Sequence, residues 1–183
     1  MIPWIAFSLG SIPLILVSWT SLHHPDSHGF YRFFAWEAIL AIFVINATKW
    51  FGDWLAWNQI ISWILLIASV IPVAIGTYQL RTRGKPDPVK RPDPGLVGYE
   101  RTTRLVSSGI YKYMRHPLYC SLLLLTWGAF FKALTQTGIT LALLSTLFLY
   151  ATAKADESEC IQVFGTAYQE YMKRTKMFIP YII

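Results

Sequence analysis

The segment Ser107–Tyr119 reads SSGIYKYMRHPLY and stands directly before an apolar run. A second polar and aromatic segment, Asp156–Tyr171, reads DESECIQVFGTAYQEY and follows another apolar run. If the two apolar runs form a helical hairpin, the two polar segments lie together at its open end, because the two ends of an antiparallel helix pair are neighbours in space. The sequence therefore predicts a polar site where two apolar helices meet the aqueous phase.

The composition indicates a chain that lies mostly in lipid. Of its 183 residues, 54% are hydrophobic and only 14% are charged, whereas a soluble domain carries roughly 25% charged residues. Eight Trp and ten Tyr agree with this, because amphipathic rings collect at membrane interfaces. The net charge of +6 is interpreted as a topology signal. We expect no nucleic-acid partner, since such a surface would need a soluble basic domain.

Three apolar stretches predict three membrane spans in the N-terminal part, at Pro3–Leu22, Phe33–Phe51 and Asn58–Leu80. The first has 20 uncharged residues, enough to cross a bilayer at 1.5 Å per residue. It lacks the basic n-region of a signal peptide, so it is kept as a span. The second carries Glu37 and Lys49, which we place near its two ends, where both side chains can reach water.

The apolar stretches Leu118–Phe131 and Gly138–Ala153 predict the closing hairpin. Pro117 favours a helix start immediately before the first of them. Ala155–Lys176 carries apolar residues at three- and four-residue steps, which predicts an amphipathic helix that lies along the membrane surface or caps the bundle. The predicted fold class is therefore all-α: a polytopic membrane bundle of about five transmembrane segments with a C-terminal amphipathic helix on the cytoplasmic face.

The segment Arg81–Arg104 is rich in Pro, Gly and charge, which predicts a loop. From residue 81 to residue 115, nine Lys or Arg stand against three acids. This excess assigns the loop to the cytoplasm and the N-terminus to the outside. We expect one structural domain with three parts: a three-span segment at 1–80, a cytoplasmic loop at 81–104, and a cofactor-binding hairpin with its terminal helix at 105–183.

Two groups of metal-type side chains are interpreted without a metal. His23–Arg32 reads HHPDSHGFYR, and Pro25 and Gly29 leave no regular helix face, so a solvated loop is predicted. Cys120 and Cys160 lack the spacing of a metal site and are interpreted as packing residues.

Ionisable and aromatic side chains gather at the open end of the predicted hairpin. They are Tyr111, Arg115, His116 and Tyr119 at its start and Asp156 and Glu157 at its end. Buried without partners, such charges would cost several kcal/mol. They therefore either pair with each other as a structural latch or bind a ligand, and the residues alone leave both interpretations open.

The order of these motifs resembles the isoprenylcysteine carboxyl methyltransferase and phospholipid methyltransferase family. The pattern is G-x-Y-x-x-x-R-H-P-x-Y, an acidic pair after a hairpin, then F-G-x-x-Y-x-x-Y and a late Pro. The matching residues are Gly109, Tyr111, Arg115, His116, Pro117, Tyr119, Asp156, Glu157, Phe164, Gly165, Tyr168, Tyr171 and Pro180. The resemblance implies an integral-membrane methyltransferase that uses S-adenosylmethionine. Its acceptor would be lipid-like, an isoprenylcysteine carboxylate or a phospholipid amine, and would come from the bilayer.

The resemblance also implies the site residues. The cofactor-binding set is Leu105, Val106, Gly109, Tyr111, His116, Pro117, Leu118, Tyr119 and Glu157. Glu157 can accept hydrogen bonds from the cofactor's amino group or ribose, and His116 can donate to its carboxylate. Arg115 and Lys154 are assigned to the substrate; the prenylcysteine enzymes carry an Arg near position 154, and a Lys offers a point charge instead of a bidentate fork. No catalytic base is identified.

Two other functions remain open. Membrane sterol and enone reductases that use NADPH have a similar C-terminal region, including an R-H-P turn and a late F-I-P, here Phe178–Pro180. A non-enzymatic adaptor, in which Arg115 and Glu157 form a latch, is the third hypothesis. The chain has no G-x-G-x-x-G motif, so a Rossmann-type cofactor site is unsupported.

Overall fold

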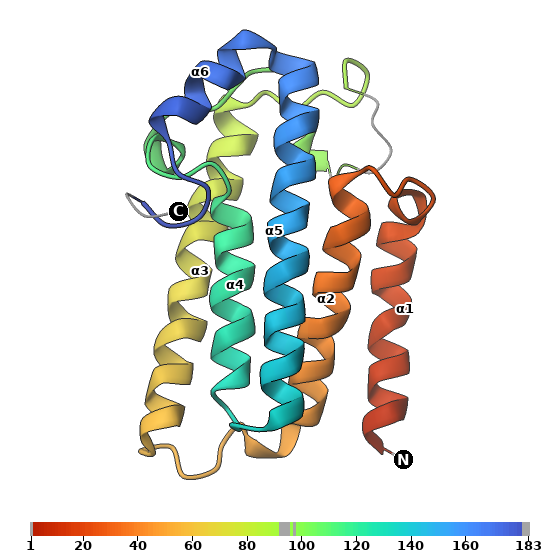
Figure 1. Ribbon diagram of the computed structural model, residues 1–183, viewed down its shortest axis with the longest axis vertical. Helices are drawn as coiled ribbons and strands as arrows, with labels where there is room; N and C mark the ends of the chain where they lie inside the picture. The colour runs from red at the N-terminus through yellow and green to blue at the C-terminus, as the bar shows by residue number, and fades with distance from the viewer. Residues whose placement is uncertain (1, 92–95, 97, 181–183) are drawn as a thin grey trace.

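Helices α1 to α5 run side by side along the long axis of the molecule (Figure 1). The computed structural model describes residues 2–91, 96 and 98–180. The α-helices are α1 (Ile2–Leu22), α2 (His28–Ile45), α3 (Trp57–Arg83), α4 (Pro117–Phe130), α5 (Gln136–Phe164) and α6 (Thr166–Arg174). Short 3-10 helices lie at Ala47–Lys49, Gly98–Glu100 and Gly109–Lys112. No strand occurs in the described residues, and the predicted all-α fold class is confirmed.

Four helices are long and apolar enough to cross a membrane, namely α1, α2, α3 and α5. Helix α4 is also apolar but has only 14 residues. A rise of 1.5 Å per residue makes α4 about 21 Å long, against about 40 Å for α3 and about 43 Å for α5. The chain is an integral membrane protein in which α4 is about half as long as the two helices that flank it.

Helix α4 packs closely on α3 through small residues. A Cβ added at Gly76 of α3 would lie 2.8 Å from Leu118 of α4. The Ser62 hydroxyl of α3 donates to the Gly128 carbonyl of α4 at 2.6 Å. Lipid offers helices little hydrophobic drive to associate, so close backbone approach and interhelical hydrogen bonds hold such pairs together. The start of α4 is thereby fixed at the level of Gly76, about two turns before α3 ends.

The second helix begins and ends earlier than its apolar pattern predicts. The expected span Phe33–Phe51 is wrong at both ends, because α2 comprises His28–Ile45. Ser27 caps the first turn through its hydroxyl oxygen, which accepts a backbone N–H of that turn. At the other end, Asn46 donates its side-chain amide to the Ala129 carbonyl at 2.8 Å. The solvated loop predicted at His23–Arg32 is therefore shorter than expected, because residues 28–32 belong to α2.

The earlier start of α2 moves Glu37 away from the membrane surface. We expected this side chain near a helix end, but it lies in the middle of α2. Its carboxylate accepts a hydrogen bond from the Ser11 hydroxyl of α1 at 2.7 Å. Glu37 therefore joins α1 to α2 instead of reaching water.

The predicted boundary between the last span and the amphipathic helix is also wrong. Residues 136–164 form one helix, α5, and the predicted helix Ala155–Lys176 is divided at Gly165. No Pro or Gly stops the helix between residues 153 and 164, whereas Gly165 adopts φ +57°, which costs glycine no steric strain. Helix α5 therefore extends beyond the start of α4, and α6 turns back over the bundle (Figure 1).

A buried lysine holds the opposite end of the bundle. Lys132, between α4 and α5, is only 2% exposed, and its ammonium donates to the Gln59 side-chain carbonyl at 3.1 Å. The ammonium lies 3.6 Å from the ring centre of Trp63 and 5.3 Å from that of Trp50. A desolvated cation–π contact of this kind contributes about 2 kcal/mol. Lys132 thus ties the hairpin tip to α3 and to the segment after α2.

We expect the substitution Lys132→Ala to lower the free energy of unfolding by about 2–4 kcal/mol, because it removes the cation–π contacts and leaves a cavity. Denaturant unfolding of the purified protein in one detergent measures this change. Lys49→Ala is the control, since Lys49 is exposed at the same end of the bundle, and we expect it to change the free energy by less than about 0.5 kcal/mol. Equal stability of the two variants would contradict the assigned role.

Candidate functional site

A pocket of about 680 Å³, partly open to solvent, lies beyond the first turn of α4. It occupies the space that the short α4 leaves between the ends of α3 and α5, and it is covered by α6, Leu96 and residues 98–106. Its lining residues are His28, Leu80, Arg91, Leu96, Glu100, Thr102, Leu105, Val106, Tyr111, Arg115, His116, Pro117, Leu118, Tyr119, Asp156, Cys160, Phe164, Tyr168 and Tyr171. Polar and aromatic side chains therefore surround one space at the open end of the hairpin.

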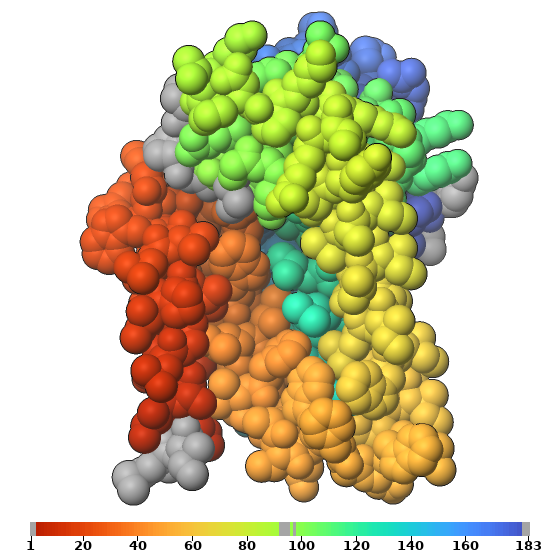
Figure 2. Space-filling view, turned by 180° about the vertical axis from the view of Figure 1, so that it is seen from behind, coloured from red at the N-terminus to blue at the C-terminus, as the bar shows by residue number. Residues whose placement is uncertain are grey.

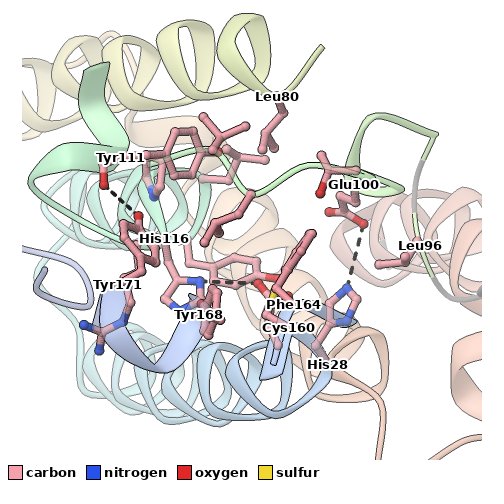
Figure 3. A pocket seen from close by; sticks show the side chains of 18 of the residues that line it. His28, Leu80, Leu96, Glu100, Tyr111, His116, Cys160, Phe164, Tyr168 and Tyr171 are labelled. Atoms are coloured by element: carbon pink, nitrogen blue, oxygen red, sulfur yellow. Dashed lines mark hydrogen bonds and ion pairs between the residues drawn. The ribbon is translucent and has the colours of Figure 1, made fainter. Parts of the chain in front are cut away.

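The lining side chains form two groups at opposite ends of the pocket (Figure 3). Tyr111, His116 and Tyr171 lie at one end, where the R-H-P turn enters α4. His28 and Glu100 lie at the other end, where α2 meets the covering segment. The two ends therefore draw on parts of the chain that are far apart in sequence.

His116 is buried between the two carboxylates of α5. Its Nδ1 lies 3.3 Å from Asp156 Oδ2, and its Nε2 lies 3.6 Å from Glu157 Oε1, beyond hydrogen-bond distance. The Nε2 atom has no hydrogen-bond partner among the described residues. The imidazole stacks on Tyr119 with ring centres 5.3 Å apart. Burial lowers the pKa of His116, but the hydrogen bond to Asp156 and the negative charge of both carboxylates outweigh it and raise the pKa above 6.5.

Arg115 and Glu157 form an ion pair behind this histidine. Arg115 Nε donates to Glu157 Oε1 at 2.7 Å, and Lys154 donates to the other carboxylate oxygen at 3.1 Å. The guanidinium also donates to the carbonyls of Met172, at 3.2 Å, and Thr175. Glu157 is only 3% exposed, and removing one partner of such a buried pair typically costs 3–5 kcal/mol. Arg115 is therefore the centre of a structural latch that joins the R-H-P turn to α5 and to the C-terminal segment.

The C-terminal segment closes the His116 end of the pocket. The His116 N–H donates to the Met177 carbonyl at 3.0 Å. The Tyr171 hydroxyl of α6 donates to the Tyr111 carbonyl at 2.7 Å. Because these bonds fix both α6 and the residues after it against the R-H-P turn, Tyr168 and Tyr171 are held as an aromatic wall of the pocket.

The wall supplied by α2 was missed by sequence reasoning. His28 is buried, with Nδ1 2.7 Å from Glu159 Oε2 and Nε2 3.8 Å from Glu100 Oε2. Arg32, one turn further along α2, pairs with Glu100 at 2.6 Å. These contacts fasten the segment that covers the pocket to α2 and α5. The four-residue spacing of His28 and Arg32 was the available signal, but it indicates one helix face only if Ser27 is recognised as the cap.

One set of described residues has the donor types of a metal site. The ligand atoms of His28, Asp156 and Glu159 all lie within 4.8 Å of one another. His28 and Glu159 already share a 2.7 Å hydrogen bond, and Arg32 supplies a neighbouring positive charge through Glu100. These contacts describe a charge network that holds the pocket wall, and we assign no metal to it.

The structure brings most of the predicted cofactor-binding residues together. Those that line the pocket are Leu105, Val106, Tyr111, His116, Pro117, Leu118 and Tyr119, and Arg115 lines it as well. Gly109, Glu157 and Lys154 are not among the lining residues. Gly109 supports the turn instead: its φ is +67°, and an added Cβ would lie 2.1 Å from the Gln79 side-chain amide. How any of these residues contacts a ligand stays a prediction.

Other lining residues were not assigned to the cofactor or the substrate from the sequence. They are His28, Leu80, Arg91, Leu96, Glu100, Thr102, Asp156, Cys160, Phe164, Tyr168 and Tyr171. Among these, Asp156 stands where an acidic contact to the cofactor was expected, but the residue predicted for that contact was its neighbour Glu157. Adjacent residues on a helix point about 100° apart, so only one of the two faces the pocket.

Comparison with known proteins finds a family match in the C-terminal part of the chain. The profile of the phospholipid methyltransferase family matches residues 96–173. Methanethiol S-methyltransferase 1 of Bradyrhizobium diazoefficiens is 31% identical over 47% of this chain and 30% of its own length. Methanethiol S-methyltransferase of Pseudomonas deceptionensis is 27% identical over 69% and 43%, respectively. Protein-S-isoprenylcysteine O-methyltransferase A of Arabidopsis thaliana is 28% identical over 47% and 44%.

These matches span less than half the length of each of the three relatives. No solved structure matches the chain. The matched range includes the R-H-P turn, the acidic pair and nearly all of α6, and every pocket-lining residue except His28, Leu80 and Arg91 lies within it. Residues 96–173 match the model of the phospholipid methyltransferase family, which confirms the resemblance of the motifs.

Proposed function

We propose that this chain is a methyltransferase that binds S-adenosylmethionine in the pocket beyond α4 and methylates a hydrophobic acceptor from the membrane. One observation carries the proposal: the residues of the family motif converge on a pocket that joins a buried histidine, a carboxylate and an aromatic wall. The family and the names of the relatives support methyl transfer. The activity of the whole protein is our proposal, because the relatives are more than twice as long as the segments they share with it.

The residues present fit S-adenosylmethionine, which has an amino group, a carboxylate, a ribose diol and a flat adenine. Asp156 lines the pocket and can accept hydrogen bonds from an amino group or a diol. His116 Nε2 is a buried nitrogen without a partner among the described residues, and its N–H can donate to a carboxylate. Tyr111, Phe164 and Tyr168 offer faces on which a flat ring can pack.

When bound, the cofactor would supply an activated methyl group on its sulfonium. The protein's task would be to align the acceptor with that methyl group and to exclude water. Two contacts keep the pocket covered: the ion pair between Glu100 and Arg32 of α2, and the hydrogen bond from the Tyr171 hydroxyl to the Tyr111 carbonyl. We infer that this end of the bundle faces the cytoplasm, since the excess of Lys and Arg between residues 81 and 115 lies there.

The acceptor would reach the pocket from the bilayer, between α2 and α3. Seen from behind, side chains of α4 are visible in a hollow between these two helices, and the hollow ends at the green segment that covers the pocket (Figure 2). The helices α2, α3 and α4 are apolar along this path. A hydrophobic acceptor could therefore approach without crossing the polar end of the molecule.

The charges favour an acceptor that carries a thiol or an amine over one that carries a carboxylate. Arg115 is already engaged by Glu157 and two backbone carbonyls. Lys154 pairs with Glu157 and does not line the pocket. The two cations assigned to the substrate from the sequence are thus occupied by the protein itself. Several of the relatives are named as S-methyltransferases of a thiol, which supports the thiol class.

Calorimetry on the purified protein tests cofactor binding. We expect S-adenosylmethionine and its demethylated product to bind, and the Asp156→Asn substitution to weaken both by roughly 10- to 100-fold, the effect of losing a charge-assisted hydrogen bond. Asp87→Asn is the matched control, because Asp87 bonds to backbone N–H groups outside the pocket, and its binding constants stay unchanged. Tight binding of NADPH without binding of S-adenosylmethionine would overturn the proposal in favour of a reductase.

Isotope-labelled S-adenosylmethionine distinguishes the acceptor classes. In bilayer nanodiscs supplied separately with an alkanethiol, a phosphatidylethanolamine and an S-farnesylcysteine analogue, we expect label in the thiol or the amine, because Arg115 and Lys154, the two cations assigned to the substrate, are paired with Glu157. Base-labile label on the farnesylcysteine, the signature of a methyl ester, would contradict the acceptor assignment while leaving cofactor binding intact.

A further inference from the structure

A patch of positive and amphipathic side chains lies on the outside of the pocket end. This patch, which we call the basic belt, consists of Arg83, Lys112, Tyr113, Lys176 and Ile179. All five side chains are exposed, Tyr113 by 45% and Ile179 by 47%. In Figure 2, side chains of the green segment after residue 109 project outward beyond α3. Neither the cofactor pocket nor the latch uses these exposed groups.

Backbone contacts hold the members of the belt together. The Lys176 N–H donates to the Tyr113 carbonyl at 3.3 Å, and residues 114 and 176 form an isolated β-bridge. Arg83, at the end of α3, donates to the Ser108 hydroxyl at 2.6 Å. The Lys112 ammonium lies 5.8 Å from the ring centre of Tyr113. Two segments more than 60 residues apart in sequence and the end of α3 therefore meet in one surface.

The belt lies at the level where the apolar part of the bundle ends. The backbone of the segment carrying Lys176 bonds to residues 115 and 116, immediately before α4 begins. The neighbouring stretch of α3 is uncharged up to Leu80 and exposes Tyr78. Tyr side chains collect at the depth of lipid headgroups, and Lys side chains extend to the same depth from below. The basic belt is therefore placed among headgroups.

The charge of the belt is not balanced by exposed acids among the described residues beside it. On α6, the exposed Glu170 is paired with Lys173 at 2.6 Å. The other carboxylates of this end that the structure places in ion pairs, Glu100, Asp156, Glu157 and Glu159, bind cations around the pocket. The belt thus offers ammonium and guanidinium groups to an external anion.

We propose that the basic belt binds the headgroup of an anionic phospholipid, with Lys112 and Lys176 on the phosphate and Tyr113 and Ile179 at the boundary with the acyl chains. Exposed Ile179 and Tyr113 distinguish a lipid from free phosphate, because an inorganic anion makes no use of an apolar neighbour. Such a site would seat the pocket end on the anionic leaflet, where each nearby Lys or Arg strengthens attraction.

Native mass spectrometry of the protein released from nanodiscs tests this site. With phosphatidylcholine and increasing phosphatidylglycerol, we expect the wild type to retain phosphatidylglycerol selectively. The double substitution Lys112→Gln/Lys176→Gln should raise the apparent dissociation constant for phosphatidylglycerol roughly thirtyfold, because it removes two lysine contacts with the anionic lipid. Lys112→Arg/Lys176→Arg keeps the charge and should keep retention. Thermal unfolding of each variant confirms that the fold is retained.

The matched control is Lys49→Gln/Lys90→Gln, which removes the same charge at exposed positions outside the belt. Equal loss of retention in the control, or full retention in the Lys112→Gln/Lys176→Gln variant, would overturn the proposal. If inorganic phosphate at millimolar concentration displaced the lipid completely, the site would be a phosphate site and the lipid assignment would be wrong. Because methyl transfer is not the measured quantity, failure here leaves the proposed enzyme function untouched.

Discussion

The difference in length between α4 and the helices beside it is the constraint on which the site depends. Helices α3 and α5 have 27 and 29 residues, whereas α4 has 14. The R-H-P turn therefore enters α4 well below the ends of its neighbours, and the side chains before and after it face a space with helical walls. Close packing at Gly76 prevents α4 from sliding along α3 to fill that space. The pocket thus lies at the edge of the apolar region, where a polar cofactor and a hydrophobic acceptor can both arrive.

The two interpretations of the charged cluster, latch and ligand site, apply to different residues. Arg115 and Glu157 satisfy each other and fix the C-terminal segment. Asp156 and His116 face the pocket, and one nitrogen of the histidine has no partner among the described residues. A buried ion pair that has several hydrogen bonds can hold a rigid wall, whereas a partly satisfied donor beside it is suited to a ligand. The latch is therefore a means of positioning the site.

The sequence predicted the architecture better than the limits of its helices. Long apolar runs made α1, α3 and the closing hairpin recognisable. The R-H-P motif identified the pocket residues at the start of α4. The start of α2 was missed because Pro25 and Gly29 suggested a loop, while the cap at Ser27 decided the boundary. The unbroken α5 was missed because amphipathic spacing was taken as a separate helix. The sequence could not show that Asp156 and His28 line the pocket whereas Glu157 does not. This depends on how α5 and α2 are rotated about their axes.

The most direct measurement is an experimental structure of the protein in a lipid nanodisc with S-adenosylhomocysteine bound. We expect density for the nucleoside between the R-H-P turn and α6, with the amino-acid end near Asp156 and His116. We also expect the Arg115–Glu157 pair to be unchanged by the ligand. Density at any other place, or an Arg115 released from Glu157 to bind the ligand, would contradict the claim that the short α4 creates the cofactor site.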